Sequence, residues 1–148
     1  MPHLLILHGP NLGLLGSREP KVYGTMTQDE LIRSVSDRAA HLGWESDFIQ
    51  SNHEGVLIDA ILDAPGRYDA ILLNPSALTH TSIALRDAVG AVPVPVVEVH
   101  LSNVHAREPY RRVSYVAETA AATVSGAGLD SYLAALTILE SRHRGVNA

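Results

Sequence analysis

Short apolar runs alternate along this chain with segments of helical periodicity, and this alternation restricts the possible folds more than any other feature. Five runs are interpreted as strands: Pro2–His8, Trp44–Gln50, Asp69–Leu73, Val94–Leu101 and Ala120–Ser125. Apolar residues recur at helical spacing in four other segments: Leu31–Leu42, Val56–Ile61, Thr81–Val89 and Leu129–Leu139. Strands that alternate with helices in this way are typical of parallel sheets, because a parallel pair needs a crossover connection.

The pattern predicts an α/β fold. Crossovers between parallel strands are right-handed, so helices are expected on both faces of one sheet. Asp69–Leu73 is almost continuously apolar, as expected for a strand covered on both sides. We predict a single flavodoxin-like domain over residues 1–148, with a five-stranded parallel sheet of order 2-1-3-4-5. Thr27-Gln28-Asp29-Glu30 has the form of a capping box and predicts a helix start.

Ligands of open α/β sheets bind beyond the carboxyl ends of the strands. Polar residues follow four of the predicted strands there: Gly9-Pro10-Asn11, Ser51-Asn52-His53, Asn74-Pro75-Ser76 and His100-Leu101-Ser102. The segment from Asn74 to Ser82 also enters a helix, where backbone N–H groups and hydroxyls suit oxygen-rich ligands. Helix capping by Thr79, Thr81 or Ser82 is an equally simple interpretation.

The connection after the first strand, His8 to Gly24, is about fifteen residues long, whereas such loops usually take about 2–6. It places glycines and prolines among apolar residues that need burial: Leu12, Leu14, Leu15 and Val22. It also carries Asn11, Arg18 and Tyr23. We interpret it as an active-site lid hinged on glycines.

Composition excludes several classes of protein. The net charge of -5 and the lack of a basic run argue against nucleic-acid binding, although Arg107, Arg111 and Arg112 would suit an anionic small molecule. The absence of cysteine excludes disulfides and thiolate chemistry. No membrane span and no signal peptide are expected, and we predict a cytoplasmic protein. Lys21 is the only lysine, so a Schiff-base mechanism would have one candidate.

Two pairs of residues could perform acid–base chemistry. A guanidinium beside a tyrosine favours the phenolate, so Arg18 could make Tyr23 a base, although a turn with a solvated arginine is an alternative. Glu98 and His100 lie two apart on a strand and therefore point to the same face. A carboxylate orients an imidazole and favours its protonated form, which suits a general acid. A buried polar pair whose members only hydrogen-bond each other is the alternative.

The sequence gives little indication of a metal site or of a nucleotide-binding motif. His100 and His105 are the closest histidine pair at the predicted site, and no second group completes a three-ligand metal site. Gly126-Ala127-Gly128 lacks the third glycine of a dinucleotide fingerprint, and no glycine-rich Lys-Ser/Thr phosphate loop is present.

Three motifs together resemble type II 3-dehydroquinate dehydratases. They are G-P-N-L-x-x-L-G-x-R-x-P-x-x-Y-G from Gly9, L-N-P-S-A-L-T-H-T-S from Leu73 and V-E-V-H-L-S-N-V-H-A-R-E-P-Y-R-R from Val97. The resemblance covers essentially the whole chain. Gly13 replaces a common asparagine, and Ser76-Ala77-Leu78 replaces a glycine–alanine pair and an aromatic residue.

The resemblance implies a stepwise anti elimination through an enolate, without a cofactor. Tyr23 would be the base, Arg18 would stabilise its phenolate, Asn11 would hold a water near the oxyanion, and His100, oriented by Glu98, would be the acid. Asn74, Leu101 and Ser102 would hold 3-dehydroquinate, backbone N–H groups of the last two binding its carboxylate. His80 and Arg111 would bind its hydroxyls, and Asp87 would reach in from a neighbouring subunit of a homododecamer, a tetramer of trimers.

The resemblance also implies a role in the shikimate pathway of aromatic amino-acid biosynthesis, with quinate catabolism as the alternative because the reaction is the same. A flavodoxin-like binding module without chemistry is the competing class. A receiver-type module would need an acidic pair after the first strand and a late lysine, whereas His8-Gly9-Pro10-Asn11 follows here. A flavin-binding module would need a hydroxyl-rich loop, which Leu14-Leu15 does not provide.

Overall fold

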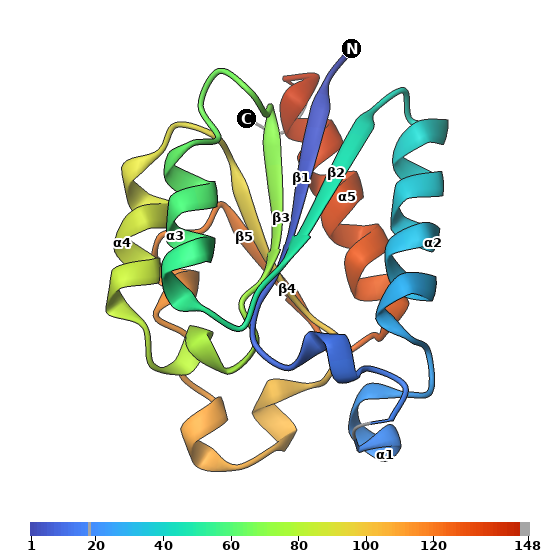
Figure 1. Cartoon of the computed structure of the whole chain (residues 1–148), viewed down its shortest axis with the longest axis vertical. Coiled ribbons are helices and arrows are strands. Elements are labelled where there is room, and N and C mark those ends of the chain that lie inside the picture. The colour runs from blue at the N-terminus through green and yellow to red at the C-terminus, as the bar shows by residue number, and fades with distance from the viewer. Residues whose placement is uncertain (18, 146–148) are drawn as a thin grey trace.

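One parallel sheet forms the centre of the protein, whose computed structural model describes residues 1–17 and 19–145 (Figure 1). The strand order is β2-β1-β3-β4-β5, and each neighbouring pair is parallel, so the predicted order is confirmed. The strand bounds differ from the predicted ones by at most two residues at either end: β1 (His3–His8), β2 (Glu45–Gln50), β3 (Ala70–Asn74), β4 (Val96–His100) and β5 (Ala122–Ser125).

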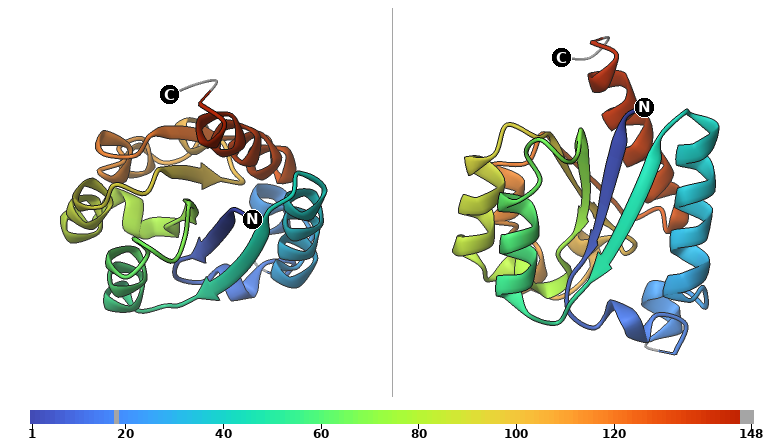
Figure 2. Two further views of the ribbon diagram at one scale, coloured as in Figure 1. Left: turned by 90° about the horizontal axis from the view of Figure 1, so that it is seen from above. Right: turned by 45° about the horizontal axis from the view of Figure 1, so that its top comes forward.

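Four long helices cover the sheet on both faces: α2 (Gln28–His41), α3 (Glu54–Leu62), α4 (Ile83–Ala91) and α5 (Leu129–His143). Helices α2 and α5 lie on one face, and α3 and α4 lie on the other (Figures 1 and 2). Strand β1 contributes side chains to the hydrophobic cores on both faces of the sheet. Leu4 and Ile6 pack in the α2/α5 core, and Leu5 and Leu7 pack in the α3/α4 core. This double coverage explains why the central strands β1 and β3 are almost continuously apolar.

The starts of α2 and α4 are set by side-chain caps. Thr27 Oγ1 accepts a hydrogen bond from the Glu30 backbone N–H at 3.2 Å, which confirms the predicted start of α2. Helix α4 begins at Ile83, later than predicted, because Ser82 is the cap and accepts from the Leu85 N–H at 2.9 Å. The residues before it form a separate 3₁₀ helix, η2 (Ser76–His80).

The long connection after β1 contains two short helices that the sequence did not predict, η1 (Leu12–Leu14) and α1 (Pro20–Tyr23). Tyr23 therefore ends a helix instead of occupying a turn. Gly16 and Gly24 flank this part of the connection with φ angles of +93° and +81°, which glycine adopts without strain. Leu12 and Leu15 are buried as predicted, but Leu14 is 53% exposed and the expectation of its burial is wrong.

The carboxyl ends of the strands lie at the bottom of Figure 1, where the short helices gather. The segment between β4 and β5 folds there as η3 (Val104–Ala106), η4 (Pro109–Arg111) and η5 (Val116–Glu118). It carries the arginine cluster to this edge. In the part of the chain that the structure describes, no helix is long and apolar enough to cross a membrane.

The ends of β1 and β3 approach each other closely at Gly9. Its N–H donates to the Asn74 carbonyl at 2.8 Å, and a Cβ at this position would lie 2.5 Å from the Pro75 carbonyl oxygen. Only glycine fits such a contact, so Gly9 keeps the two strand ends together.

His8, the last residue of β1, is fully buried between two polar partners. Its Nδ1 lies 2.9 Å from Gln28 Oε1, and its Nε2 lies 2.8 Å from the Tyr132 hydroxyl. Burial lowers the pKa of His8 from 6.5 to about 4, and the hydrogen bond to Gln28 opposes this only partly. The folded protein therefore holds His8 neutral, whereas the unfolded chain protonates it below pH 6.5.

We expect His8 to make folding pH-dependent. Because its folded pKa is depressed, its contribution is complete above pH 6.5 and is lost as the pH falls towards about 4. One pH unit corresponds to about 1.4 kcal/mol. The fall from pH 6.5 to about 4 should therefore lower the free energy of unfolding by about 3 kcal/mol. Urea unfolding of the wild type and of His8→Asn at pH 7 and pH 4.5 would measure it. Equal pH dependence in the two proteins would contradict the assignment.

Candidate active site

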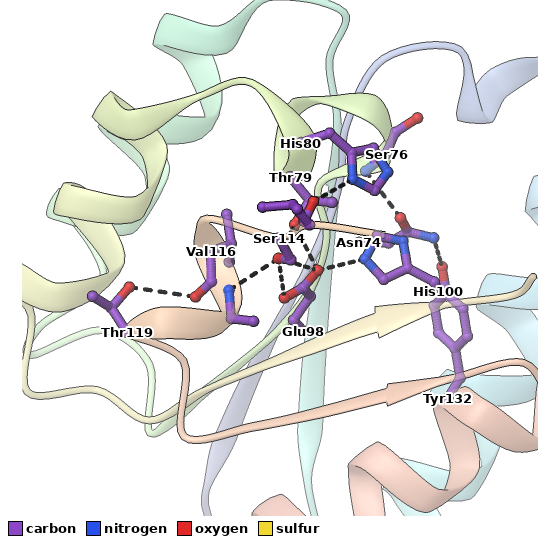
Figure 3. Close-up of polar contacts among 12 residues, drawn as sticks. Asn74, Ser76, Thr79, His80, Glu98, His100, Ser114, Val116, Thr119 and Tyr132 are labelled. Atoms are coloured by element: carbon purple, nitrogen blue, oxygen red, sulfur yellow. Dashed lines mark hydrogen bonds and ion pairs between the residues drawn. The ribbon is translucent and has the colours of Figure 1, made fainter. Parts of the chain in front are cut away.

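Glu98 and His100 form a buried pair at the carboxyl end of β4, on the same face of the strand as predicted (Figure 3). His100 Nε2 lies 2.5 Å from Glu98 Oε2. Burial by itself would raise the pKa of Glu98, but hydrogen bonds from His100, Thr79 and Ser114 outweigh burial, and the pKa lies below its ordinary value. Glu98 is therefore a carboxylate that engages Nε2–H and leaves His100 Nδ1 for a ligand.

Two hydroxyls complete the surroundings of this carboxylate. Thr79 Oγ1 donates to Glu98 Oε2 at 2.5 Å, and Ser114 Oγ donates to Glu98 Oε1 at 2.9 Å. The Ala117 backbone N–H in turn donates to Ser114 Oγ at 3.0 Å, which holds that hydroxyl. Sequence reasoning considered Thr79 only as a helix cap and did not include Ser114 at all.

His80 lies beside the pair. Its Nδ1 donates to the Val113 carbonyl at 2.7 Å, and its ring stacks on that of His100 with centroids 6.3 Å apart. Burial is the main reason that the pKa of His80 is lowered. His80 is thus a neutral imidazole whose Nε2 can accept a hydrogen bond, which suits the predicted contact with a ligand hydroxyl.

A cavity of about 190 Å³ opens at this edge of the sheet. Most of its lining residues carry an imidazole, a hydroxyl or a guanidinium, groups that can bind a polyhydroxylated anion. Its lining comprises Thr79, His80, Glu98, His100, Val104, His105, Arg111, Arg112, Ser114, Ala117 and Thr123. Arg111, which was predicted to bind the ligand, lies in this wall.

Tyr23 lies against an arginine that the sequence did not assign to it. Arg107 Nη1 donates to the Tyr23 hydroxyl at 2.9 Å, and the guanidinium carbon lies 5.1 Å from the centre of the ring. The positive charge of this guanidinium therefore lies against the phenol oxygen. The partner predicted for Tyr23 was Arg18, which lies outside the described residues. Arg107 belongs to the arginine cluster noted in the sequence, but nothing there connected it to Tyr23.

The tyrosine and the histidine line adjacent cavities rather than one. Tyr23 lines a second cavity of about 240 Å³ with Leu15, Gly24, Thr25, Met26, Leu31, Leu101, Gly128 and Leu129. Leu101 follows His100 directly, so the end of β4 contributes a residue to each cavity. Electrostatic interactions connect Arg111 with Tyr23 on one side and with His80 on the other. The arginine cluster therefore joins the two halves.

The other predicted site residues are placed as follows. Asn74 and Ser102 are buried at the ends of β3 and β4. Asn11 is exposed beyond β1, and its backbone N–H donates to Asn52 Oδ1 at 3.0 Å. Asp87 lies on α4, where its side chain is 63% exposed and pairs with Arg86 at 2.9 Å, outside the lining of both cavities. Among the described residues, no group of three or more His, Asp or Glu side chains could hold a metal ion.

The fold and these pairs define a doubly wound α/β protein with acid–base groups at the carboxyl edge of its sheet. Residues 2–140 match the model of the family described as Dehydroquinase class II, and the chain belongs to that family.

Its relatives are similar over nearly their full length. The 3-dehydroquinate dehydratase 1 of Corynebacterium efficiens is 52% identical over 140 residues, which cover 95% of this chain and 93% of the relative. The catabolic 3-dehydroquinase 2 of Aspergillus flavus is 51% identical over 136 residues, covering 92% and 91%. The crystal structure of the type II dehydroquinase from Butyrivibrio crossotus superposes with a TM-score of 0.92 at 37% identity, covering 95% of this chain and 98% of that one.

Proposed function

We propose that this protein dehydrates 3-dehydroquinate to 3-dehydroshikimate by a stepwise anti elimination, with Tyr23 as base and His100 as acid. The observation that carries the proposal is that the two groups lie on different structural elements. The carboxylate-bound imidazole lies on the rigid sheet edge, and the guanidinium-bound phenol lies on the connection after β1. The name of the Corynebacterium efficiens relative states dehydration of 3-dehydroquinate, and the Aspergillus flavus relative is named a 3-dehydroquinase.

In the first step Tyr23 removes a proton from C2 of the substrate, next to the ketone. The Arg107 guanidinium donates a hydrogen bond to the phenol and stabilises the phenolate that this step requires. We assign the same stabilising role to Arg18. The electrons of the C2–H bond move into the carbonyl and form an enolate. Asn11 holds a water near the enolate oxygen, where a hydrogen-bond donor is effective because charge develops there.

In the second step the enolate re-forms the ketone, the C1–O bond breaks, and His100 Nδ1 delivers a proton so that the hydroxyl leaves as water. Glu98 supports the imidazolium through the hydrogen bond at Nε2. The proton that Tyr23 took then returns to His100 through solvent, and no cofactor takes part.

Substrate binding uses both cavities. Asn74 and the backbone N–H groups of Leu101 and Ser102 hold the ring and its carboxylate, while His80 and Arg111 bind the ring hydroxyls. Asp87 contributes from a neighbouring subunit of a homododecamer built as a tetramer of trimers. Its exposed position on α4, beside the 58% exposed Ile83, supports a contact between subunits on that face. The product supplies the shikimate pathway, and quinate catabolism is the alternative role.

Substrate labelled stereospecifically with deuterium at C2 tests the geometry of the reaction. A base on the lid and an acid on the sheet edge approach opposite faces of the ring, so the deuteron trans to the C1 hydroxyl should be lost and the cis deuteron retained. Mass spectrometry of the product measures this. Loss of the cis deuteron would contradict the proposed placement of Tyr23 and His100.

Sodium borohydride separates this mechanism from Schiff-base catalysis. Lys21 is the only lysine of the chain, its side chain is exposed, and it lines neither cavity. Incubation with borohydride and substrate together should therefore leave the same activity as borohydride alone. Inactivation that depends on substrate, with mass added at Lys21, would contradict the proposal.

A further inference from the structure

Four polar side chains, three of them buried, form a continuous hydrogen-bonded chain from the first turn of α2 to the end of β3. Gln28 Oε1 contacts His8 Nδ1 at 2.9 Å, His8 Nε2 contacts the Tyr132 hydroxyl at 2.8 Å, and that hydroxyl contacts Asn74 Nδ2 at 2.8 Å. His8 and Tyr132 are 0% exposed, and Asn74 is 3% exposed. The reaction steps described above use only the last member, Asn74.

One backbone group determines the direction of every hydrogen bond in this chain. The Ser76 N–H can only donate, and it lies 3.0 Å from Asn74 Oδ1, so the amide nitrogen of Asn74 must face Tyr132 (Figure 3). Asn74 Nδ2 then donates to the Tyr132 oxygen, and the single phenolic proton of Tyr132 must go to His8 Nε2. His8 therefore carries its proton on Nδ1 and donates it to Gln28 Oε1.

The ionisation of the two central groups agrees with this direction. Burial keeps His8 neutral, with a pKa of about 4, so Nε2 has the lone pair that the chain requires. Burial also raises the pKa of Tyr132, which keeps its proton available for His8. With this arrangement, each hydrogen bond in this chain has one donor and one acceptor.

We propose that Tyr132 and His8 are positioning residues for the substrate amide contact: they hold the Asn74 carboxamide in one orientation and so leave one Nδ2 hydrogen and one Oδ1 lone pair for the substrate. The inference rests on the proposed function, in which Asn74 binds the substrate. Without the phenol, Asn74 loses an acceptor and His8 loses a donor, and the carboxamide is held by the Ser76 N–H alone.

Steady-state kinetics of Tyr132→Phe with 3-dehydroquinate test the inference. KM should rise about tenfold, the effect of about one lost hydrogen bond, while kcat falls less than about threefold. A merely destabilised protein would lose active sites and so lower kcat at unchanged KM. Tyr68→Phe is the matched control, because it removes a phenol that donates to Asp47 at 2.8 Å outside both cavities. The control should keep the wild-type KM.

A double-mutant cycle shows whether Tyr132 acts through Asn74. Tyr132→Phe should raise KM in the wild type but change it little in the Asn74→Ala background. An unchanged KM in Tyr132→Phe, or an equal rise in both backgrounds, would overturn the inference.

Neutron diffraction of the unmodified protein tests the same arrangement without a variant and without activity. A deuteron on His8 Nδ1 and none on Nε2 is the expected result, and the reverse would overturn the inference. Absence of dehydratase activity in the wild type would instead contradict the proposed function and with it the role given to Asn74, even where the deuteron lies on Nδ1.

Discussion

Tyr23→Phe is expected to lower kcat by at least about 10², the low end for loss of a general base. The change removes one oxygen and keeps the ring that packs at the end of α1, so KM should change far less. The hydrogen bond from Arg107 to the phenol is lost as well. Steady-state kinetics with 3-dehydroquinate give both constants.

Tyr110→Phe provides the matched control for this variant. Tyr110 also stacks with an arginine of the cluster, since Arg111 Cζ lies 5.3 Å from its ring centre, but its side chain is exposed and it lines neither cavity. It should retain wild-type kcat. Near-wild-type turnover of Tyr23→Phe would show that Tyr23 is not the base.

His100→Ala is expected to lower kcat by at least about 10² because the departing hydroxyl loses its proton donor. Glu98 keeps the hydroxyls of Thr79 and Ser114 after the imidazole is removed, so the folded structure should persist. The space left beside the cavity should accept free imidazole, and adding imidazole to the assay should restore part of the lost rate.

His41→Ala, on the exposed side of α2, is the control and should be fully active, since its Nδ1 contacts only the Asp37 carbonyl. Turnover of His100→Ala within a few-fold of the wild type would assign the acid to another group. His80 would then be the first alternative, because its ring stacks on that of His100.

The architecture followed from local patterns. Runs such as Leu4–Leu7 and Ile71–Leu73 are apolar on both faces, which predicted parallel strands covered on both sides. The strand order was predicted because 2-1-3-4-5 is a common order for five βα units. Thr27 predicted the start of α2 because one side chain makes the cap. The start of α4 was predicted too early because Thr81 and Ser82 can both cap a helix, and Ser82 is the one that does. Helix α1 is four residues long, too short for periodicity to be visible.

The site was predictable where its geometry is local. Glu98 and His100 share a face because side chains two apart on a strand always do. Ser114 and Arg107 reach their partners from the segment between β4 and β5, and Arg107 is 84 residues from Tyr23. Such contacts depend on how that segment folds over the sheet edge. The arginine assigned to Tyr23 by the sequence was Arg18, and that role stays a prediction.

The central claim is tested most directly by following the ultraviolet absorbance of a 3-dehydroquinate solution after the protein is added. Dehydration creates a carbon–carbon double bond conjugated with the ketone, and this enone absorbs where the substrate does not. We predict an absorbance rise whose initial rate is proportional to protein concentration and which is almost abolished in Tyr23→Phe and His100→Ala. No absorbance change with the folded wild-type protein would contradict the account.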